Sequence, residues 1–190
     1  MLQSLFLWFY CLPMSRAVML LVISSAVYLF LRAKFNTRRF WRRVIVLLLF
    51  IWLAVILAAT LTGRTEGTVA ASPELIPFHS YRAVMAGANP EILRSNFMNV
   101  VLFYPAGLLA AELCPARWSR IKRVVIVTLL FILLSAAIEF CQYCFALGLV
   151  EIDDVIHNGF GALAGTLAAE LAFKAGVNPA KINCDDDSFF

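Results

Sequence analysis

The sequence predicts an all-α membrane protein, a compact bundle of about five transmembrane helices. Of its 190 residues, 62% are hydrophobic and 15% are charged, and the mean hydropathy is +0.84. A soluble domain carries about 25% charged residues. The apolar residues gather in runs of about 20, which as helices can cross the ~30 Å of hydrocarbon in a bilayer. No polar stretch is long enough for a second folded domain, so we expect a single bundle.

The charges indicate the orientation of the bundle rather than a surface for nucleic acid. The net charge is +4, but the basic residues cluster at the ends of apolar runs, where they determine which side of the membrane a loop occupies. The first apolar segment has no basic region before it and no small-x-small cleavage site, so we predict that it is retained. Five cysteines, an odd number scattered along the chain, do not indicate a disulfide framework.

The first two predicted spans are residues 14–31 and 44–61. Between them, residues 32–43 hold six basic side chains and no acidic one. By the positive-inside rule this loop is cytoplasmic and the N-terminus is outside. The chain divides into an N-terminal span with its basic loop, a transmembrane domain and a cytoplasmic tail with no expected order: residues 1–43, 44–175 and 176–190.

The loop over residues 62–95 is then outside the cell, and its charges are of mixed sign. Pro73, Pro77 and Pro90 forbid one continuous helix. Apolar residues in such a loop indicate either a lid or re-entrant piece that lies on the bundle, or a loop that stays at the membrane interface. The sequence leaves both open.

The last three predicted spans are residues 96–113, 124–147 and 154–173. Pro105 and Gly107 interrupt the first of them, where a proline removes one backbone hydrogen bond and often kinks the helix. Residues 114–123 hold four basic side chains and no acidic one, so this loop is cytoplasmic again. Gly161 and Gly165 form a small-xxx-small face that allows close helix packing. The C-terminus is therefore predicted inside.

A set of polar side chains falls at one level, in the half of three spans predicted to face outside. Polar and ionisable groups are costly in hydrocarbon and usually mark a partner or a site. We expect the inner half to hold essentially none. The predicted members of an outer pocket are Asn99, Glu139, Gln142, Asp153, Asp154, His157 and Asn158.

The sequence leaves a purely structural role and a chemical role open for the same residues. Asp154 can cap the last helix, and the amide side chains can serve only as hydrogen bonds between helices. Carboxylates with an imidazole are also the residue types of a metal site or an acid/base pair. There is no fixed ligand spacing, so we predict no metal and no cofactor, and no catalytic residue can be named.

Four short patterns are similar to the VanZ-like family of bacterial membrane proteins over about residues 44–175. They are Leu75-Ile-Pro-Phe, Asn99-x-x-x-Phe103-x-Pro105-x-Gly107, Ile138-Glu139-x-x-Gln142 and Asp153-Asp154-x-x-x-Asn158-x-x-Gly161-x-x-x-Gly165. The family is named for a protein associated with resistance to the glycopeptide teicoplanin. It commonly has an arginine near the position of Gly148, and Arg82 or Arg94 can substitute for it here.

The resemblance implies a multi-pass protein of the inner (plasma) membrane that influences glycopeptide resistance. Its outer pocket would engage a lipid-linked cell-envelope precursor or an amphiphilic antibiotic, so the expected partner is a membrane lipid or lipid-linked precursor and not nucleic acid. The alternative is an intramembrane hydrolase or transferase that acts on a lipid headgroup. The sequence does not indicate an oligomeric state.

Overall fold

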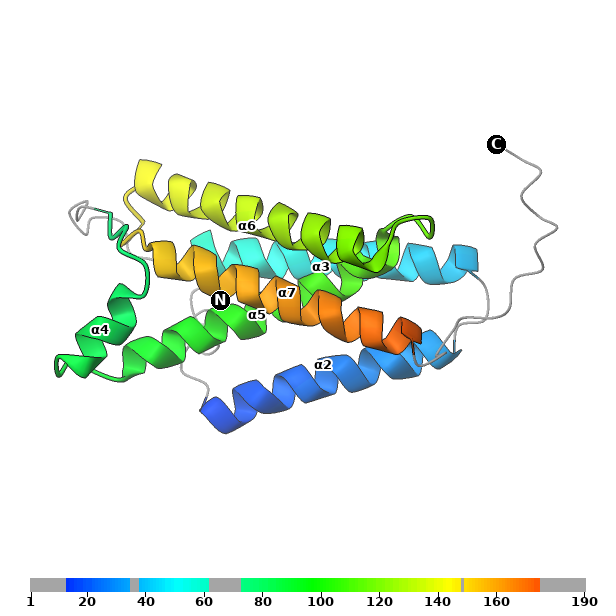
Figure 1. Cartoon of the computed structure of the whole chain (residues 1–190), viewed down its shortest axis with the longest axis horizontal. Coiled ribbons are helices and arrows are strands. Elements are labelled where there is room, and N and C mark those ends of the chain that lie inside the picture. Colours follow the sequence, from blue (N-terminus) through cyan, green and yellow to red (C-terminus); the bar gives the residue numbers. More distant parts are fainter. Residues whose placement is uncertain (1–12, 35–37, 62–72, 148, 175–190) are drawn as a thin grey trace.

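The computed structural model describes residues 13–34, 38–61, 73–147 and 149–174. Within these ranges it holds six helices and no strand, so the predicted all-α bundle is confirmed. Their bounds are α2 (Met14–Lys34), α3 (Arg38–Leu61), α4 (His79–Met85), α5 (Glu91–Leu113), α6 (Arg120–Cys144) and α7 (Ile152–Lys174). The five long helices run side by side, and the short α4 lies at one end of the bundle (Figure 1). The predicted tail, residues 176–190, lies outside the described residues.

Four of the described helices are long and apolar enough to cross a membrane: Met14–Lys34, Arg39–Leu61, Glu91–Leu113 and Arg120–Cys144. They correspond to the first four predicted spans. The fifth predicted span corresponds to α7, which has the same length as α5, 23 residues, but is not among these four helices. It packs against α5 and α6 along the bundle (Figure 1). That α7 crosses the membrane, and which way the termini face, stay predictions.

Four helices begin earlier than the predicted spans, α3 at residue 38 instead of 44 and α7 at residue 152 instead of 154. The other two are α5 and α6. The helix α5 begins at Glu91 instead of residue 96, directly after Pro90, and it continues through Pro105 without a break. The helix α6 begins at Arg120 instead of residue 124, and the Ser119 hydroxyl caps it by accepting a hydrogen bond from the N–H of Lys122. Both extensions are charged turns at the edge of an apolar run, where a hydropathy pattern gives no signal.

Glycines bring the backbones of α5 and α7 into direct contact. A Cβ atom at Gly107 would overlap the carbonyl of Ala162, and a Cβ at Gly161 would overlap the carbonyl of Val100. A Cβ at Gly165 would overlap the carbonyl of Tyr104. Such close approach is the usual function of small residues in membrane helices. The α5–α7 pair is therefore the centre of the bundle, and it carries most of the polar side chains described below.

The two ends of the bundle differ in charge. The "α4 end" holds α4, the end of α6 and the start of α7, while the "basic end" holds the start of α3 and α6 and the ends of α2 and α7 (Figure 1). At the basic end, buried Arg32 forms an ion pair with Glu112, and Tyr28 donates a hydrogen bond to the same carboxylate at 2.6 Å.

A second buried carboxylate lies at the basic end on α7. Both oxygens of Glu170 accept hydrogen bonds from Arg123, at 2.6 and 3.1 Å, and Arg120 lies 3.8 Å away. The expectation that this half of the bundle holds essentially no polar side chain is therefore wrong. The carboxylates of Glu112 and Glu170 lie next to apolar runs, yet they point inward and meet arginines from neighbouring helices.

Residues 73–90 cover the α4 end of the bundle. Glu74 forms a parallel bridge with Glu151: its N–H donates to the carbonyl of Val150, and its own carbonyl accepts from the N–H of Ile152. Side chains on the outer side of the segment are apolar and exposed, with Leu75 at 65% and Met85 at 83%. The segment thus lies on the bundle, as one prediction had it, and presents an apolar surface suited to the membrane interface, as the other had it.

Candidate functional site

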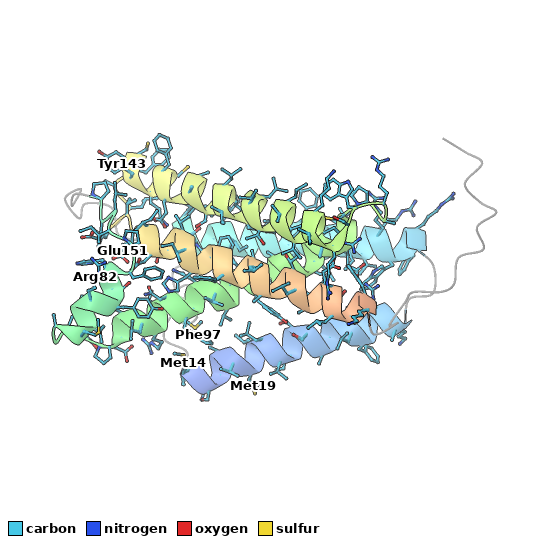
Figure 2. The ribbon with its side chains drawn as sticks, in the orientation of Figure 1. Met14, Met19, Arg82, Phe97, Tyr143 and Glu151 are labelled. Carbon is cyan, nitrogen blue, oxygen red and sulfur yellow. The ribbon has the colours of Figure 1, made fainter. Side chains whose placement is uncertain are left out.

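Buried polar side chains gather at the α4 end, between α5, α6, α7 and the covering segment. Figure 2 shows Arg82, Tyr143 and Glu151 at this end of the molecule. Asp154 is half-buried. The other residues of this set, called the polar cluster below together with Asp154, are buried: Asn96, Asn99, Glu139, Gln142, Asp153, His157 and Asn158. All seven residues of the predicted outer pocket therefore belong to it.

Asp153 holds the covering segment in place. One of its carboxylate oxygens accepts a hydrogen bond from the N–H of Phe78, and the other accepts from the N–H and the hydroxyl of Ser80. Phe78 has a φ of 59°, in the left-handed region that costs a non-glycine residue about 1–2 kcal/mol. The three hydrogen bonds offset that strain. Asp153 therefore acts as the anchor of the segment that begins α4.

His157 makes a second clasp on the same segment. Its Nδ1 faces the backbone carbonyl of Asp153, and its Nε2 lies 2.8 Å from the hydroxyl of Tyr81. The two rings are stacked with centroids 5.7 Å apart. The carbonyl of Asp153 can only accept a hydrogen bond, so Nδ1 of His157 carries a proton and donates it. In that tautomer Nε2 has no proton and accepts a hydrogen bond from the hydroxyl of Tyr81. The Nδ1 contact lies within α7 and orients the ring, and the Nε2 contact holds α4 against α7.

Asp154 points to a different neighbour because successive residues of an α-helix are about 100° apart. Its Oδ1 accepts a hydrogen bond from the side-chain amide of Asn99 on α5 at 2.7 Å. One turn earlier on α5, the amide of Asn96 donates to the hydroxyl of Ser80 at 2.9 Å. The adjacent carboxylates of α7 therefore serve two contacts, Asp153 with the covering segment and Asp154 with α5.

Helix α6 contributes a polar stripe on its buried face. Ser135, Glu139 and Gln142 recur at intervals of three or four residues, so they lie on one side of the helix. Glu139 is 6% exposed, and its Oε2 accepts a hydrogen bond from the N–H of Glu151 at 3.2 Å. Its carboxylate thus lies at the junction where the chain enters α7.

Two side-chain oxygens of the cluster are buried without a hydrogen-bond partner among the described residues. The amide of Gln142 donates to the carbonyl of Thr60, in the last turn of α3, at 2.9 Å, and the amide of Asn158 donates to the hydroxyl of Ser135 at 2.8 Å. The other end of each amide, Gln142 Oε1 and Asn158 Oδ1, is left over. The partner at Thr60 is a backbone carbonyl, which can only accept a hydrogen bond. The NH2 group of the Gln142 side chain therefore faces Thr60, and its Oε1 faces away. Buried acceptors of this kind usually meet a water or a ligand.

The cluster is therefore rich in acceptors and suited to bind hydrogen-bond donors. Among the described residues, no three His, Cys, Asp or Glu side chains are grouped to hold a metal ion. The position of Gly148 lies outside the described residues. Of the two arginines considered as substitutes, Arg82 is exposed, and Arg94 forms an ion pair with Glu91 at 2.6 Å.

Sequence reasoning missed four residues that contact the cluster. Ser80 and Tyr81 follow the Leu75-Ile-Pro-Phe pattern after one intervening residue, His79, and their polar side chains near it were the available signal. Thr60 takes part through a backbone carbonyl at a helix end, which no side-chain pattern reveals. Ser135 lies four residues before Glu139, on the same helical face, and that spacing could have indicated it.

Searches among curated proteins and among solved structures found no match to this chain. The apolar helices make it a multi-pass membrane protein. The sequence model of one family, VanZ/LLP1, matches residues 40–173, which include α3 to α7 except for the first two residues of α3 and the last residue of α7. The chain therefore belongs to the VanZ/LLP1 family.

Proposed function

We propose that this protein binds a lipid-linked cell-envelope precursor, or an amphiphilic glycopeptide such as teicoplanin, through its polar cluster. Binding would lower the susceptibility of the cell to the glycopeptide. The class of function rests on family membership, because the VanZ family is named for a protein associated with teicoplanin resistance. The location rests on the buried polar groups at the α4 end.

The positive-inside rule supports an orientation that makes the cluster reachable from outside the cell. Arginines and lysines gather at the basic end, where α2 ends with Arg32 and Lys34 and where α3 and α6 begin. That end would face the cytoplasm of a bacterial inner membrane. The α4 end would then face the compartment in which envelope precursors are displayed and glycopeptides act.

The observation that carries the proposal is the pair of unsatisfied acceptors beside a buried carboxylate. Gln142 is fully buried and Asn158 is 3% exposed, yet each has one side-chain oxygen that makes no hydrogen bond within the described residues. An unsatisfied buried acceptor costs about 1–3 kcal/mol. If these residues only packed helices together, apolar side chains could fill the same space without an unsatisfied acceptor. A ligand with hydroxyl or amide donors would satisfy both oxygens.

The competing possibility is that the cluster only joins the helices. Membrane hydrogen bonds of this kind contribute about 0.6 kcal/mol each on average, so removing one would change stability slightly and nothing else. The two roles differ in what Glu139 does. A ligand would depend on the charge or the proton of Glu139, whereas a helix contact such as its hydrogen bond with the N–H of Glu151 needs only an acceptor.

The experiment compares teicoplanin susceptibility of a sensitive bacterial host that expresses wild type, Glu139→Gln, Glu91→Gln or an empty vector. Glu91 is an exposed carboxylate at the same end of the bundle, so it controls for the loss of one negative charge. We expect wild type and Glu91→Gln to lower susceptibility and Glu139→Gln to match the empty vector at equal membrane abundance. Equal susceptibility of all four strains would contradict the proposal.

A further inference from the structure

The first turns of α3 carry a stripe of arginines that continues into apolar side chains. The residues occur at spacings of three, four, seven, eight and eleven from the first, so they share one face of the helix. They line a groove of about 560 Å³. The six residues are Arg39, Arg42, Arg43, Val46, Leu47 and Phe50.

These arginines differ from the two arginines that are held inside the basic end. Arg32 and Arg123 are paired with the buried carboxylates of Glu112 and Glu170. Arg39, Arg42 and Arg43 are exposed, and none of them forms an ion pair with a described residue. Three guanidinium groups on one stripe therefore form a surface whose positive charge must be balanced from outside the described chain.

The apolar half of the groove indicates what kind of anion balances it. Leu47 is 60% exposed and Phe50 is 69% exposed, so the stripe offers a hydrophobic surface directly beside the charges. Phe50 lies seven residues beyond Arg43, roughly 10 Å further along the helix axis. A soluble anion would leave this surface uncovered, whereas an amphiphile with a phosphate next to acyl chains covers both halves.

We propose that the groove binds one anionic phospholipid of the leaflet at the basic end. Its phosphate lies among the three arginines, whose planar guanidinium groups hydrogen-bond phosphate oxygens in pairs. One acyl chain lies along Leu47 and Phe50. The site is independent of the polar cluster, because it occupies the opposite end of the bundle and the outward face of α3.

The test measures lipid retention by native mass spectrometry of protein released from nanodiscs with equal amounts of phosphatidylglycerol and phosphatidylcholine. We expect wild type to retain phosphatidylglycerol preferentially. The variant R39Q/R42Q/R43Q should reduce that preference by roughly tenfold or more, because it removes the guanidinium groups that hydrogen-bond the phosphate in the groove. The control R16Q/R117Q/K122Q removes three exposed basic residues elsewhere and should retain the wild-type preference.

Loss of three charges can also change how the chain inserts, so a second variant keeps every arginine. Leu47→Ala/Phe50→Ala should weaken lipid retention several-fold without altering the charge of the basic end. Excess glycerol phosphate should not displace the lipid. Equal retention of both lipids by wild type, full retention by R39Q/R42Q/R43Q, or displacement of the lipid by excess glycerol phosphate would each overturn the proposal.

Discussion

The two ends of the bundle bury their carboxylates with different partners. At the basic end, Glu112 and Glu170 meet the guanidinium groups of Arg32 and Arg123. At the α4 end, Asp153 accepts hydrogen bonds from Ser80 and Phe78, Asp154 accepts one from Asn99, and Glu139 accepts one from a backbone N–H.

This difference indicates that the basic end serves stability and that the α4 end is suited to bind a ligand. An ion pair with bidentate geometry satisfies its carboxylate and needs nothing further. The α4 end instead keeps the leftover oxygens of Gln142 and Asn158 buried. We therefore expect substitutions at the basic end to change stability and substitutions at the α4 end to change activity.

The largest expected effect is at the basic end. Arg32→Met should destabilise the protein by about 4 kcal/mol, because it leaves Glu112 buried without its guanidinium partner. The double variant Arg32→Met/Glu112→Leu should recover most of that stability, since no buried charge remains. Thermal unfolding in detergent measures both. A single variant as stable as wild type would remove the structural role assigned to this pair.

A smaller loss of stability is expected where α5 and α7 pack closely at Gly165. Gly165→Leu should cost about 3 kcal/mol, because the new side chain overlaps the backbone of α5 at Tyr104. Ala164→Leu is the matched control, since Ala164 is exposed on the same helix and the added side chain would face lipid. If Gly165→Leu unfolds at the same temperature as Ala164→Leu, the close approach of α5 and α7 is not needed for stability.

At the α4 end, Asp153→Ala should cost about 2 kcal/mol and loosen the covering segment. The variant removes three hydrogen bonds to Phe78 and Ser80, whose strained backbone then loses its anchor. Amide hydrogen exchange should rise for residues 73–90 and stay unchanged for α2 and α3. Uniformly faster exchange would show that Asp153 supports the whole bundle and not the segment alone.

The smallest expected change in stability is for Glu139→Gln, under about 1 kcal/mol. A glutamine has the same shape and can still accept the hydrogen bond from the N–H of Glu151. Thermal unfolding at matched detergent concentration measures it. If Glu139→Gln loses as much stability as Arg32→Met, the carboxylates at both ends are needed for stability, and the contrast between the ends is wrong.

The sequence could predict the fold because apolar runs and basic loops are local patterns. It also placed Asn99, Glu139 and Asn158 at one end, since each lies near the same end of its run. It could not pair them: Asp153 and Ser80 are 73 residues apart in the chain, and their contact depends on how the covering segment folds back. The ion pairs of Glu112 and Glu170 were missed for a related reason, because hydropathy does not reveal which way a terminal carboxylate points.

The most direct test of the contrast is saturation binding of a lipid-linked peptidoglycan precursor, and separately of teicoplanin, to the protein in nanodiscs. The proteins to compare are wild type, Glu139→Gln and Arg32→Met/Glu112→Leu. The account predicts that at least one of the two ligands binds, that Glu139→Gln weakens this binding at least roughly tenfold, about 1.4 kcal/mol, and that the double variant at the basic end binds like wild type. Equal binding by all three proteins, or equal loss in both variants, would contradict it.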